Sequence, residues 1–273
     1  MYKRRFVFAF LILLLFIDSP AESAGLTVHF LDVGQADAAV LLCDGEVMMI
    51  DGGNVADSSL IYTYLTKTLG LKHIDYIIAT HPHEDHIGGL SAALNSCTVG
   101  MIFTPITEYD NNVYADLQKY ADLQSTPMIV PAVGECFSFG SAEVQFLSPC
   151  REYADINDLS LVVRVDYGEN SFLFAGDAGW EAEHDMIESG LSLSADVLKV
   201  GHHGSDTASS YVFIREVMPE YAVISVGSDN PYGHPSEVVI SRLQDAGTTV
   251  YRTDQCGTII CQSNGKDICF ATE

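Results

Sequence analysis

Short runs of apolar and β-branched residues alternate along the chain with longer segments in which apolar residues recur every three or four positions. The first pattern is typical of buried strands and the second of amphipathic helices. Strands are expected at 26–31, 38–43, 47–50, 76–79, 99–103, 159–165, 172–175, 197–200 and 222–226. Helices are expected near 58–69, 86–95, 113–123, 179–188, 208–217 and 235–246. This alternation predicts one layered α/β domain whose sheets are covered by helices.

Polar residues stand where four of these apolar runs stop. Asp51 and His81 follow two runs in the first half of the chain, and Asp177 and the pair His202-His203 follow two in the second half. Loops at strand ends are where α/β folds place their chemistry. The pattern therefore predicts functional residues at these four positions.

The first residues have the composition of an export signal. Basic residues at 3–5 precede an apolar run at 6–17, and the small residues Ala21 and Ser23 stand at −3 and −1 of a cleavage after Ser23. A transmembrane helix needs about 20 apolar residues, so this run is short for one, and an uncleaved anchor is the alternative. We expect a signal peptide at 1–23, a domain at 24–273, and a secreted or cell-surface protein with no stable membrane partner.

Composition narrows the choice of substrate. The hydrophobic content of 48% excludes a disordered chain, and 13 Lys and Arg against 37 Asp and Glu give a formal charge of −24. Affinity for nucleic acid comes largely from basic side chains that neutralise phosphates, so the chain lacks the material for a broad basic groove. A substrate that carries phosphate would have to be met by a bound metal instead.

The seven cysteines show no Cys-x-x-Cys spacing, which argues against a cysteine zinc site. Cys261 and Cys269 flank a turn sequence at 263–266 and could face each other across a hairpin. The odd number leaves at least one thiol unpaired within the chain.

The densest group of chemically active side chains is the segment 81–86, with the sequence HPHEDH, directly after the run 76–79. Imidazole and carboxylate are ligands that Zn, Mn and Fe accept. Three histidines and one aspartate in six residues are more than one metal takes from a single turn. Two adjacent ions would explain the cluster better than a solvated loop that happens to contain these residues.

The motif His-x-His-x-Asp-His resembles that of the metallo-β-lactamase superfamily. Further segments are similar to the hydrolase domain of ComEC/Rec2 competence proteins and their free-standing exported relatives, and to the phosphorylcholine esterase catalytic domain: 29–38, 50–53, 157–161, 175–177, 198–205 and 232–235. The resemblance implies a hydrolase domain with the αββα sandwich fold and a two-metal site at one edge.

The resemblance also implies roles for the motif. His81 and His83 would bind one metal, Asp85 and His86 the other, and Asp177 would bridge the two. Asp85 and Asp177 are therefore expected to be both ligands and catalytic residues. The expected cofactors are two divalent ions, Zn or Mn, with Fe a further candidate.

One usual ligand is missing from the pattern. Many superfamily members have a further histidine near the position of Asn157, and asparagine is a poor ligand for zinc. The resemblance suggests that the His202-His203 pair fills this gap at the first metal and that His234 has the corresponding place at the second. We favour His203 as the ligand and His202 as a catalytic proton donor, and the reverse remains open.

Three further positions are candidates for orienting the ligands. Asp51 could hold a ligating histidine through its other ring nitrogen, although an aspartate before Gly-Gly also forms turns. Asp32 and Asp37 flank residues 33–35, where loop capping alone would explain both. Asp32 and Asn157 are kept with Asp51 as supporting residues.

Two ions bridged by a carboxylate lie about 3.5–4 Å apart and share a water whose pKa falls toward 7. The expected function is therefore an exported binuclear hydrolase, a phosphodiesterase or nuclease that acts through a metal-bridging hydroxide on DNA or another phosphodiester. Two alternatives stay open. One is a phosphorylcholine or teichoic acid esterase, or a lactonase, on the same fold, and the other is a non-catalytic metal-binding module.

Overall fold

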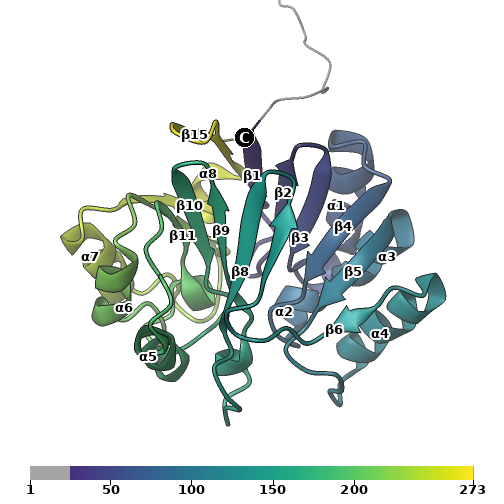
Figure 1. Ribbon diagram of the computed structural model, residues 1–273, viewed down its shortest axis with the longest axis horizontal. Coiled ribbons are helices and arrows are strands. Elements are labelled where there is room, and N and C mark those ends of the chain that lie inside the picture. The colour runs from purple at the N-terminus through teal and green to yellow at the C-terminus, as the bar shows by residue number, and fades with distance from the viewer. Residues whose placement is uncertain (1–24, 273) are drawn as a thin grey trace, which may run out of the picture.

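Two β-sheets packed face to face form the centre of the protein in this computed structural model, which describes residues 25–272 (Figure 1). The expected signal segment 1–23 lies outside the described residues. The eight-stranded sheet has the order β15-β14-β1-β2-β3-β4-β5-β6, and the seven-stranded sheet has the order β13-β12-β11-β10-β9-β8-β7. Each half of the chain therefore builds most of one sheet.

The elements have the following bounds. The strands are β1 Leu26–Phe30, β2 Ala39–Cys43, β3 Glu46–Ile50, β4 His73–Ile78, β5 Thr98–Phe103, β6 Met128–Ile129, β7 Cys136–Phe139, β8 Ala142–Ser148, β9 Val162–Tyr167, β10 Asn170–Phe174, β11 Val197–Lys199, β12 Tyr221–Ile224, β13 Thr249–Arg252, β14 Ile259–Ser263 and β15 Ile268–Thr272. The helices are α1 Ser58–Thr63, α2 Glu84–Ile87, α3 Leu90–Ser96, α4 Asn112–Gln124, α5 Trp180–Ser189, α6 Tyr211–Val217, α7 Glu237–Asp245 and α8 Thr253–Cys256. Short turns of other helix types are η1 Val55–Asp57, η2 Tyr64–Thr68, η3 Asn157–Leu159 and η4 Gly201–Gly204.

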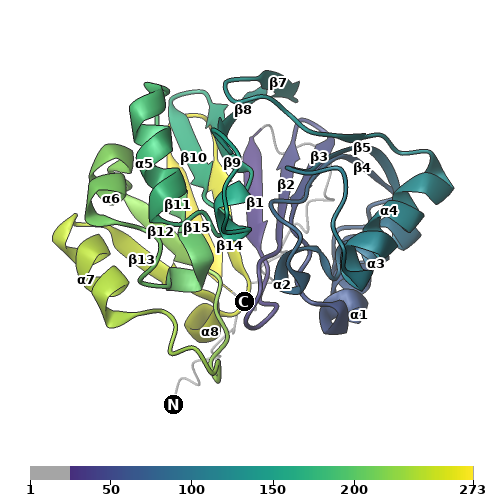
Figure 2. The same cartoon turned by 90° about the horizontal axis from the view of Figure 1, so that it is seen from below.

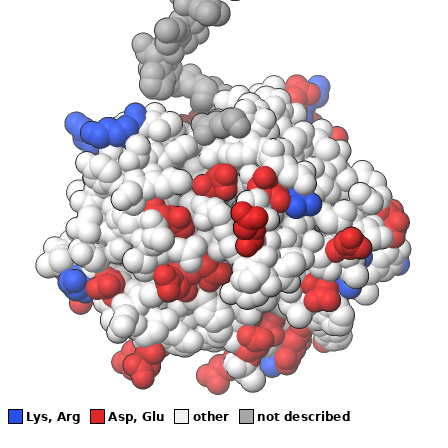
Figure 3. Space-filling view, turned by 180° about the vertical axis from the view of Figure 1, so that it is seen from behind, with Lys and Arg blue, Asp and Glu red and all other residues white. Residues whose placement is uncertain are grey.

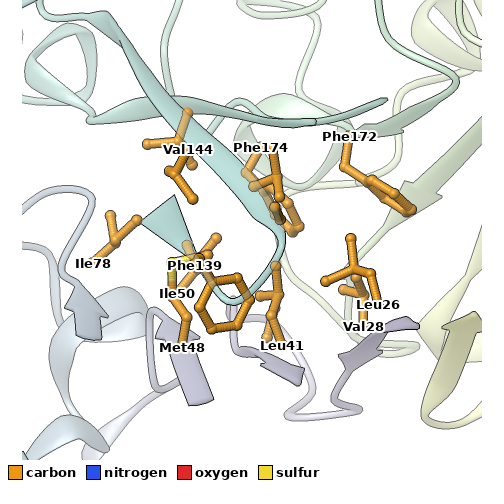
Figure 4. Close-up of a cluster of buried hydrophobic side chains, with 14 of the residues drawn as sticks. Leu26, Val28, Leu41, Met48, Ile50, Ile78, Phe139, Val144, Phe172 and Phe174 are labelled. Atoms are coloured by element: carbon orange, nitrogen blue, oxygen red, sulfur yellow. The ribbon is translucent and has the colours of Figure 1, made fainter. Parts of the chain in front are cut away.

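The alternation of side chains along the strands creates three apolar layers. In β2, Leu41 points into the cluster between the two sheets, whereas its neighbour Val40 points to the helices on the outer face, because successive strand residues face opposite sides. Figure 4 shows Leu41 with residues of the other sheet, such as Phe172 and Phe174. Helices α1, α3 and α4 flank one sheet and α5, α6 and α7 the other, as Figure 2 shows. The predicted αββα sandwich is confirmed.

All nine expected strands and six expected helices are present, with shifted ends. The strand expected from 159 begins only at Val162, because η3 precedes it. The helix expected near 86–95 is divided into α2 and α3 at Gly88 and Gly89. A Cβ on Gly89 would lie 2.0 Å from the carbonyl oxygen of Gly52, so only glycine allows these two segments to pass. Sequence patterns did not predict β6, β7, β8 and β13, which are short or rich in polar residues.

The two cysteines of the predicted hairpin do not face each other. Register pairs Cys261 with Phe270 and Cys269 with Gln262, and the thiols of all seven cysteines are free. Because a shift of one residue turns a side chain to the other face of a sheet, Cys261 is buried while Cys269 is exposed. Among residues 25–272, no helix is long and apolar enough to cross a membrane.

The topology brings the ends of several strands to one edge of the sandwich. Strand β3 runs parallel to β4, and β10 runs parallel to β11, which in turn runs parallel to β12. The carboxyl ends of parallel neighbours lie at the same edge of a sheet. Residues that follow β3 and β4 in one sheet, and β10 and β11 in the other, are therefore placed near one another.

Glu183 joins the helices on the outer face of the second sheet. It lies in the first turn of α5, is 2% exposed, and accepts hydrogen bonds from the backbone N–H groups of Ser209 and Ser210 at the start of α6. Arg242 of α7 donates to the carbonyl oxygen of Ser209. Burial raises the pKa of Glu183 to about 7.

We expect Glu183 to make stability fall as pH rises. The folded protein holds the proton of this carboxyl up to a pKa of about 7, against a usual value of 4.5, so its stabilising contribution is complete below pH 4.5 and is lost as pH rises through 7. In Glu183→Gln this titration is absent. The free energy of unfolding of the variant relative to wild type should rise by up to about 3 kcal/mol between pH 4.5 and 8. Denaturant titrations at several pH values measure it.

Glu216→Gln on the neighbouring helix α6 is the control, because Glu216 is exposed and makes no ion pair within residues 25–272. Its difference from wild type should not change with pH. An equally flat profile for Glu183→Gln would contradict the expectation.

Candidate metal centre

The loop after β4 and the short helix α2 carry the HPHEDH segment. His81 lies in the loop, and His83 is the extended residue that precedes the helix. Asp85 and His86 occupy its first turn, with His86 fully buried and Asp85 partly exposed. The Nε2 atom of His81 is 3.0 Å from Nδ1 of His83, so these two imidazoles present nitrogen atoms to the same point. The predicted motif is thus folded into one compact group.

Asp177 belongs to the other sheet and is the third residue after the end of β10. Gly176 precedes it with a φ of +53°, and a Cβ at Gly176 would lie 2.9 Å from Cβ of Ser160. Only glycine fits this left-handed, crowded position without strain. The backbone N–H of Asp177 donates to Oγ of Ser160 at 3.0 Å, which fixes where the carboxylate begins.

The pair His202-His203 lies in η4 after β11, and both residues have left-handed backbone conformations, with φ of +50° and +52°. Such conformations are uncommon for residues other than glycine and cluster at functional sites. His203 is buried and His202 is partly exposed. The turn therefore places the imidazole of His203 in the interior and that of His202 nearer the surface, at the same edge of the sandwich.

The carboxylate of Asp177 is the centre of the arrangement, because imidazole nitrogens from both sheets surround it. Its Oδ1 is 3.2 Å from Nε2 of His86, and its Oδ2 is 3.9 Å from Nε2 of His81, 3.6 Å from Nε2 of His202 and 4.0 Å from Nε2 of His203.

Buried polar atoms at this centre have no hydrogen-bond partner among the residues that the structure describes. They include Nε2 of His86, Nε2 of His203 and Oδ1 of Asp177. Native proteins satisfy nearly all buried polar groups, so three such atoms facing one another need an explanation. Imidazole nitrogens and carboxylate oxygens are ligands of Zn, Mn and Fe, and bound divalent ions would satisfy them. The residues present therefore fit the expected metals.

The ligand atoms fall into two overlapping groups. His81, His86 and Asp177 offer atoms within 4.8 Å of one another, and so do Asp85, His86 and His203. Nε2 of His203 is 3.3 Å from Oδ2 of Asp85. His203 thus lies with the residues expected at the second metal, and which ion it binds stays a prediction. Asp85 of α2 faces the turn that follows β11, because His203 lies in that turn. The spacing of residues in the sequence does not show that these two segments lie opposite each other.

His234 lies at the outer side of the centre. Its ring is 5.8 Å from that of His202 and stacks at 5.6 Å on Tyr232, and its Nδ1 is 3.5 Å from Nε2 of Gln35. Asn230 holds this loop by donating to the carbonyl oxygens of Gly227 and His234. Within residues 25–272, the groups close enough to share a metal do not include His234. His83 is absent from those groups as well, so the expected roles of both histidines stay predictions.

Asp51 contacts the ring nitrogen of His86 that points away from Asp177. Its Oδ2 is 2.8 Å from Nδ1 of His86, and it accepts hydrogen bonds from the hydroxyl and the backbone N–H of Thr80 at 2.7 and 2.9 Å. A carboxylate at Nδ1 leaves Nε2 of the same ring free to bind a metal. Asp51 has a φ of +57°, which aims its side chain across the ends of two strands.

Asp37, and not Asp32, contacts His203, the buried histidine that follows β11. Asp32 is exposed and accepts only the local N–H of Gly34 among described contacts, so it forms a turn. Asp37 is buried, with Oδ1 3.1 Å from Nδ1 of His203 and Oδ2 2.7 Å from Nζ of Lys199. Sequence analysis missed Lys199, because it lies within an apolar strand.

The η3 turn contributes one further contact. Ser160, at its end, lies with Oγ 3.4 Å from Nδ1 of His81 while accepting the N–H of Asp177. Asn157, in the same turn, has a buried Oδ1 with no hydrogen-bond partner among residues 25–272.

Burial and charge set the protonation of these groups in the absence of metal. Burial, with the charge of His86, holds the pKa of His81 well below its usual range. Burial disfavours charge on His203 and His86, but the surrounding carboxylates together outweigh it: Asp177, Asp37 and Asp85 raise the pKa of His203 to about 10, and Asp177 and Asp51 raise that of His86 well above normal. Metal ions must displace protons from these two rings.

Comparison with known proteins agrees with this geometry. Residues 31–228 match the family model described as the metallo-beta-lactamase superfamily. The chain belongs to the metallo-beta-lactamase superfamily. Within it the chain is of the ComEC/Rec2 type, because it is 31% identical over 265 residues to ComE operon protein 3 of Bacillus subtilis, covering 90% of this chain and 34% of that protein. It is 30% identical over 242 residues to Competence protein ComA of Neisseria gonorrhoeae, covering 88% and 32%.

This metallo-beta-lactamase domain spans about a third of the length of these curated relatives. Among solved structures it is similar to Igni18, a metallo hydrolase from Ignicoccus hospitalis, with a TM-score of 0.57 and 18% identity over 86% of this chain and 98% of that one. That likeness shows the shared fold. The family match places the protein in a superfamily of metallo-hydrolases.

The geometry predicts different effects for two histidine variants. His203→Ala removes a nitrogen that faces Asp85, so the purified variant should retain about one metal ion fewer per chain than wild type. His234→Ala should retain the wild-type amount. Metal analysis after dialysis measures both, and circular dichroism checks folding. If His234→Ala loses an ion and His203→Ala does not, the grouping given above is wrong.

Proposed function

We propose that the protein is an exported, binuclear metal-dependent phosphodiesterase. One observation carries the proposal: Asp177, from one sheet, lies with its two oxygens against imidazoles from both sheets, at 3.2 Å from His86 and 3.6 Å from His202. A carboxylate with ligands on both sides is the arrangement that a pair of metal ions requires. Two divalent ions bound there supply a nucleophile at neutral pH and offset charge on a phosphodiester.

The chain's own residues would divide the work between ligation and proton transfer. His81, His83 and one oxygen of Asp177 would hold one ion, and Asp85 and His86 would hold the other together with His203 and Asp177. His202 would hold or donate a proton for the leaving group. Its side chain is 27% exposed, so substrate can reach it, and its Nδ1 lies 3.2 Å from Oγ1 of Thr207, which orients the ring.

The rim of the centre supports a substrate with aromatic parts. Tyr232 is 69% exposed and stacks on His234, at the outer side of the centre. Exposed aromatic rings bind unpaired nucleic-acid bases by stacking. Carboxylates are scattered over the face shown in Figure 3 and basic residues are few, so a long duplex would meet repulsion. Single-stranded DNA is the substrate we propose.

A comparison of model substrates tests the reaction. The metal-loaded protein without residues 1–23 should hydrolyse bis-p-nitrophenyl phosphate and single-stranded DNA faster than p-nitrophenyl phosphorylcholine or a homoserine lactone. Asp177→Ala should reduce the rate by at least about 100-fold, because it removes the carboxylate shared by both ligand groups. Preferred turnover of phosphorylcholine ester or lactone would favour the other hydrolase classes. Metal binding without turnover of any of them would indicate a non-catalytic module.

Substitution of the rim tyrosine tests the substrate class. Tyr232→Ala should raise KM for a single-stranded oligonucleotide about tenfold, since one base stack is lost, and leave kcat and the rate with bis-p-nitrophenyl phosphate near wild type. Tyr211→Ala, on α6, is the matched control, because Tyr211 is similarly exposed at 54%. Equal KM values for the two variants would contradict a stacking role for Tyr232.

A further inference from the structure

We propose that Asp37 is a positioning residue for His203 in the metal centre and that Lys199 holds Asp37 in that role. The inference rests on the proposed metal centre and adds to it two residues that contact no substrate. It is carried by a chain of contacts that runs from Lys199 through Asp37 to the imidazole of His203.

The first step is the environment of the His203 ring. Its Nδ1 lies 3.1 Å from the carbonyl oxygen of Ser225 and 3.1 Å from Oδ1 of Asp37. Both neighbours are acceptor atoms, so Nδ1 carries the hydrogen when the ring is neutral. The ring N–H donates to Ser225, and Oδ1 of Asp37 faces the same nitrogen with no hydrogen bond of its own among residues 25–272. Nε2 then presents its lone pair to the side of Asp85, where it has no hydrogen-bond partner among residues 25–272. A ligating histidine is commonly fixed in this way through its second nitrogen.

The second step is the burial of Lys199. This side chain is 5% exposed, and its ammonium contacts Oδ2 of Asp37 at 2.7 Å and the carbonyl oxygen of Val200 at 3.0 Å. A buried ammonium is unfavourable without a partner, so a lysine within the apolar strand β11 requires a specific role. The contact shows that role: Lys199 holds the carboxylate whose other oxygen faces His203.

Asp37 and Asp51 have corresponding places beside two of the histidines. Each carboxylate lies at Nδ1 of one histidine of the same ligand group, Asp51 at His86 and Asp37 at His203. Thr80 supplies two hydrogen bonds to Asp51.

Lys199 supplies the corresponding support to Asp37. Ligand atoms of Asp37, Asp51 and His86 also lie within 4.8 Å of one another, which is close enough for a cation. Asp37, Asp51 and Lys199 line one small cavity behind the metal ligands. The Lys199 ammonium offsets the charge of Asp37, while His86 and Thr80 partner Asp51, so each of the two buried carboxylates has its own partners.

Three variants separate a positioning role from a purely structural one: Asp37→Leu, Lys199→Met and the double variant. Each single substitution leaves one buried charge without a partner and should lower the stability of the metal-free protein, measured by denaturant titration. The double variant removes both charges and should recover most of that stability, because apolar residues of similar volume can replace a buried ion pair.

Metal affinity should not recover with stability. Titration with Zn²⁺ or Co²⁺ should show that the second equivalent binds about 10- to 100-fold more weakly to Asp37→Leu and to the double variant. The absorption spectrum of bound Co²⁺ gives an independent signal of changed coordination. The matched control is Asp166→Leu/Arg164→Met, which removes an ion pair of the same 2.7 Å length on β9. Its metal affinity should equal that of wild type.

Recovery of both stability and metal affinity in the double variant would overturn the inference, because the pair would then serve folding alone. Unchanged affinity in Asp37→Leu would overturn it as well. If wild type itself bound fewer than two ions, the metal centre would fail and the proposed function with it. That result is distinct, because it appears before any substitution is made.

Discussion

The burial of Asp177 is the constraint on which the rest of the structure depends. A carboxylate that is 1% exposed lies among imidazoles supplied by two different sheets, and several of the facing atoms have no hydrogen-bond partner in the described chain. Such a cluster is unfavourable in a protein interior unless cations satisfy it. The affinity of the centre for metal and the stability of the fold are therefore linked, because the ligands are gathered only when both sheets are in place.

The way that the sheets meet explains how these ligands are gathered. Asp51 and the HPHEDH segment follow β3 and β4 in one sheet. Asp177 and the histidine pair follow β10 and β11 in the other. The inner strands β3, β10 and β11 are buried on both faces, so their ends are fixed points from which short loops carry the side chains. Left-handed backbone at Asp51 and at the histidine pair then sets the final directions. The flanking strands keep these residues in the unfavourable left-handed conformation.

Periodicity and motif spacing predicted the layers, most strands and the ligand motif, because these depend on local sequence. They did not predict which ligands share a metal, since that depends on which strand ends lie opposite across the two sheets. Asp32 and Asp37 were equivalent by spacing, and only the fold shows that one is exposed while the other meets Lys199. Lys199 itself gave no signal, because one lysine in the apolar run 197–200 resembles an edge-strand residue. Strands β7 and β8 were missed for a similar reason, since polar residues interrupt them.

The left-handed turn at Gly201–Gly204 has a consequence for how this site can change over evolution. It lets two consecutive residues place one imidazole in the buried carboxylate cluster and the other at the accessible side of the same cluster. A residue inserted or deleted in this turn would therefore disturb both imidazoles at once, whereas a single replacement changes only one of them.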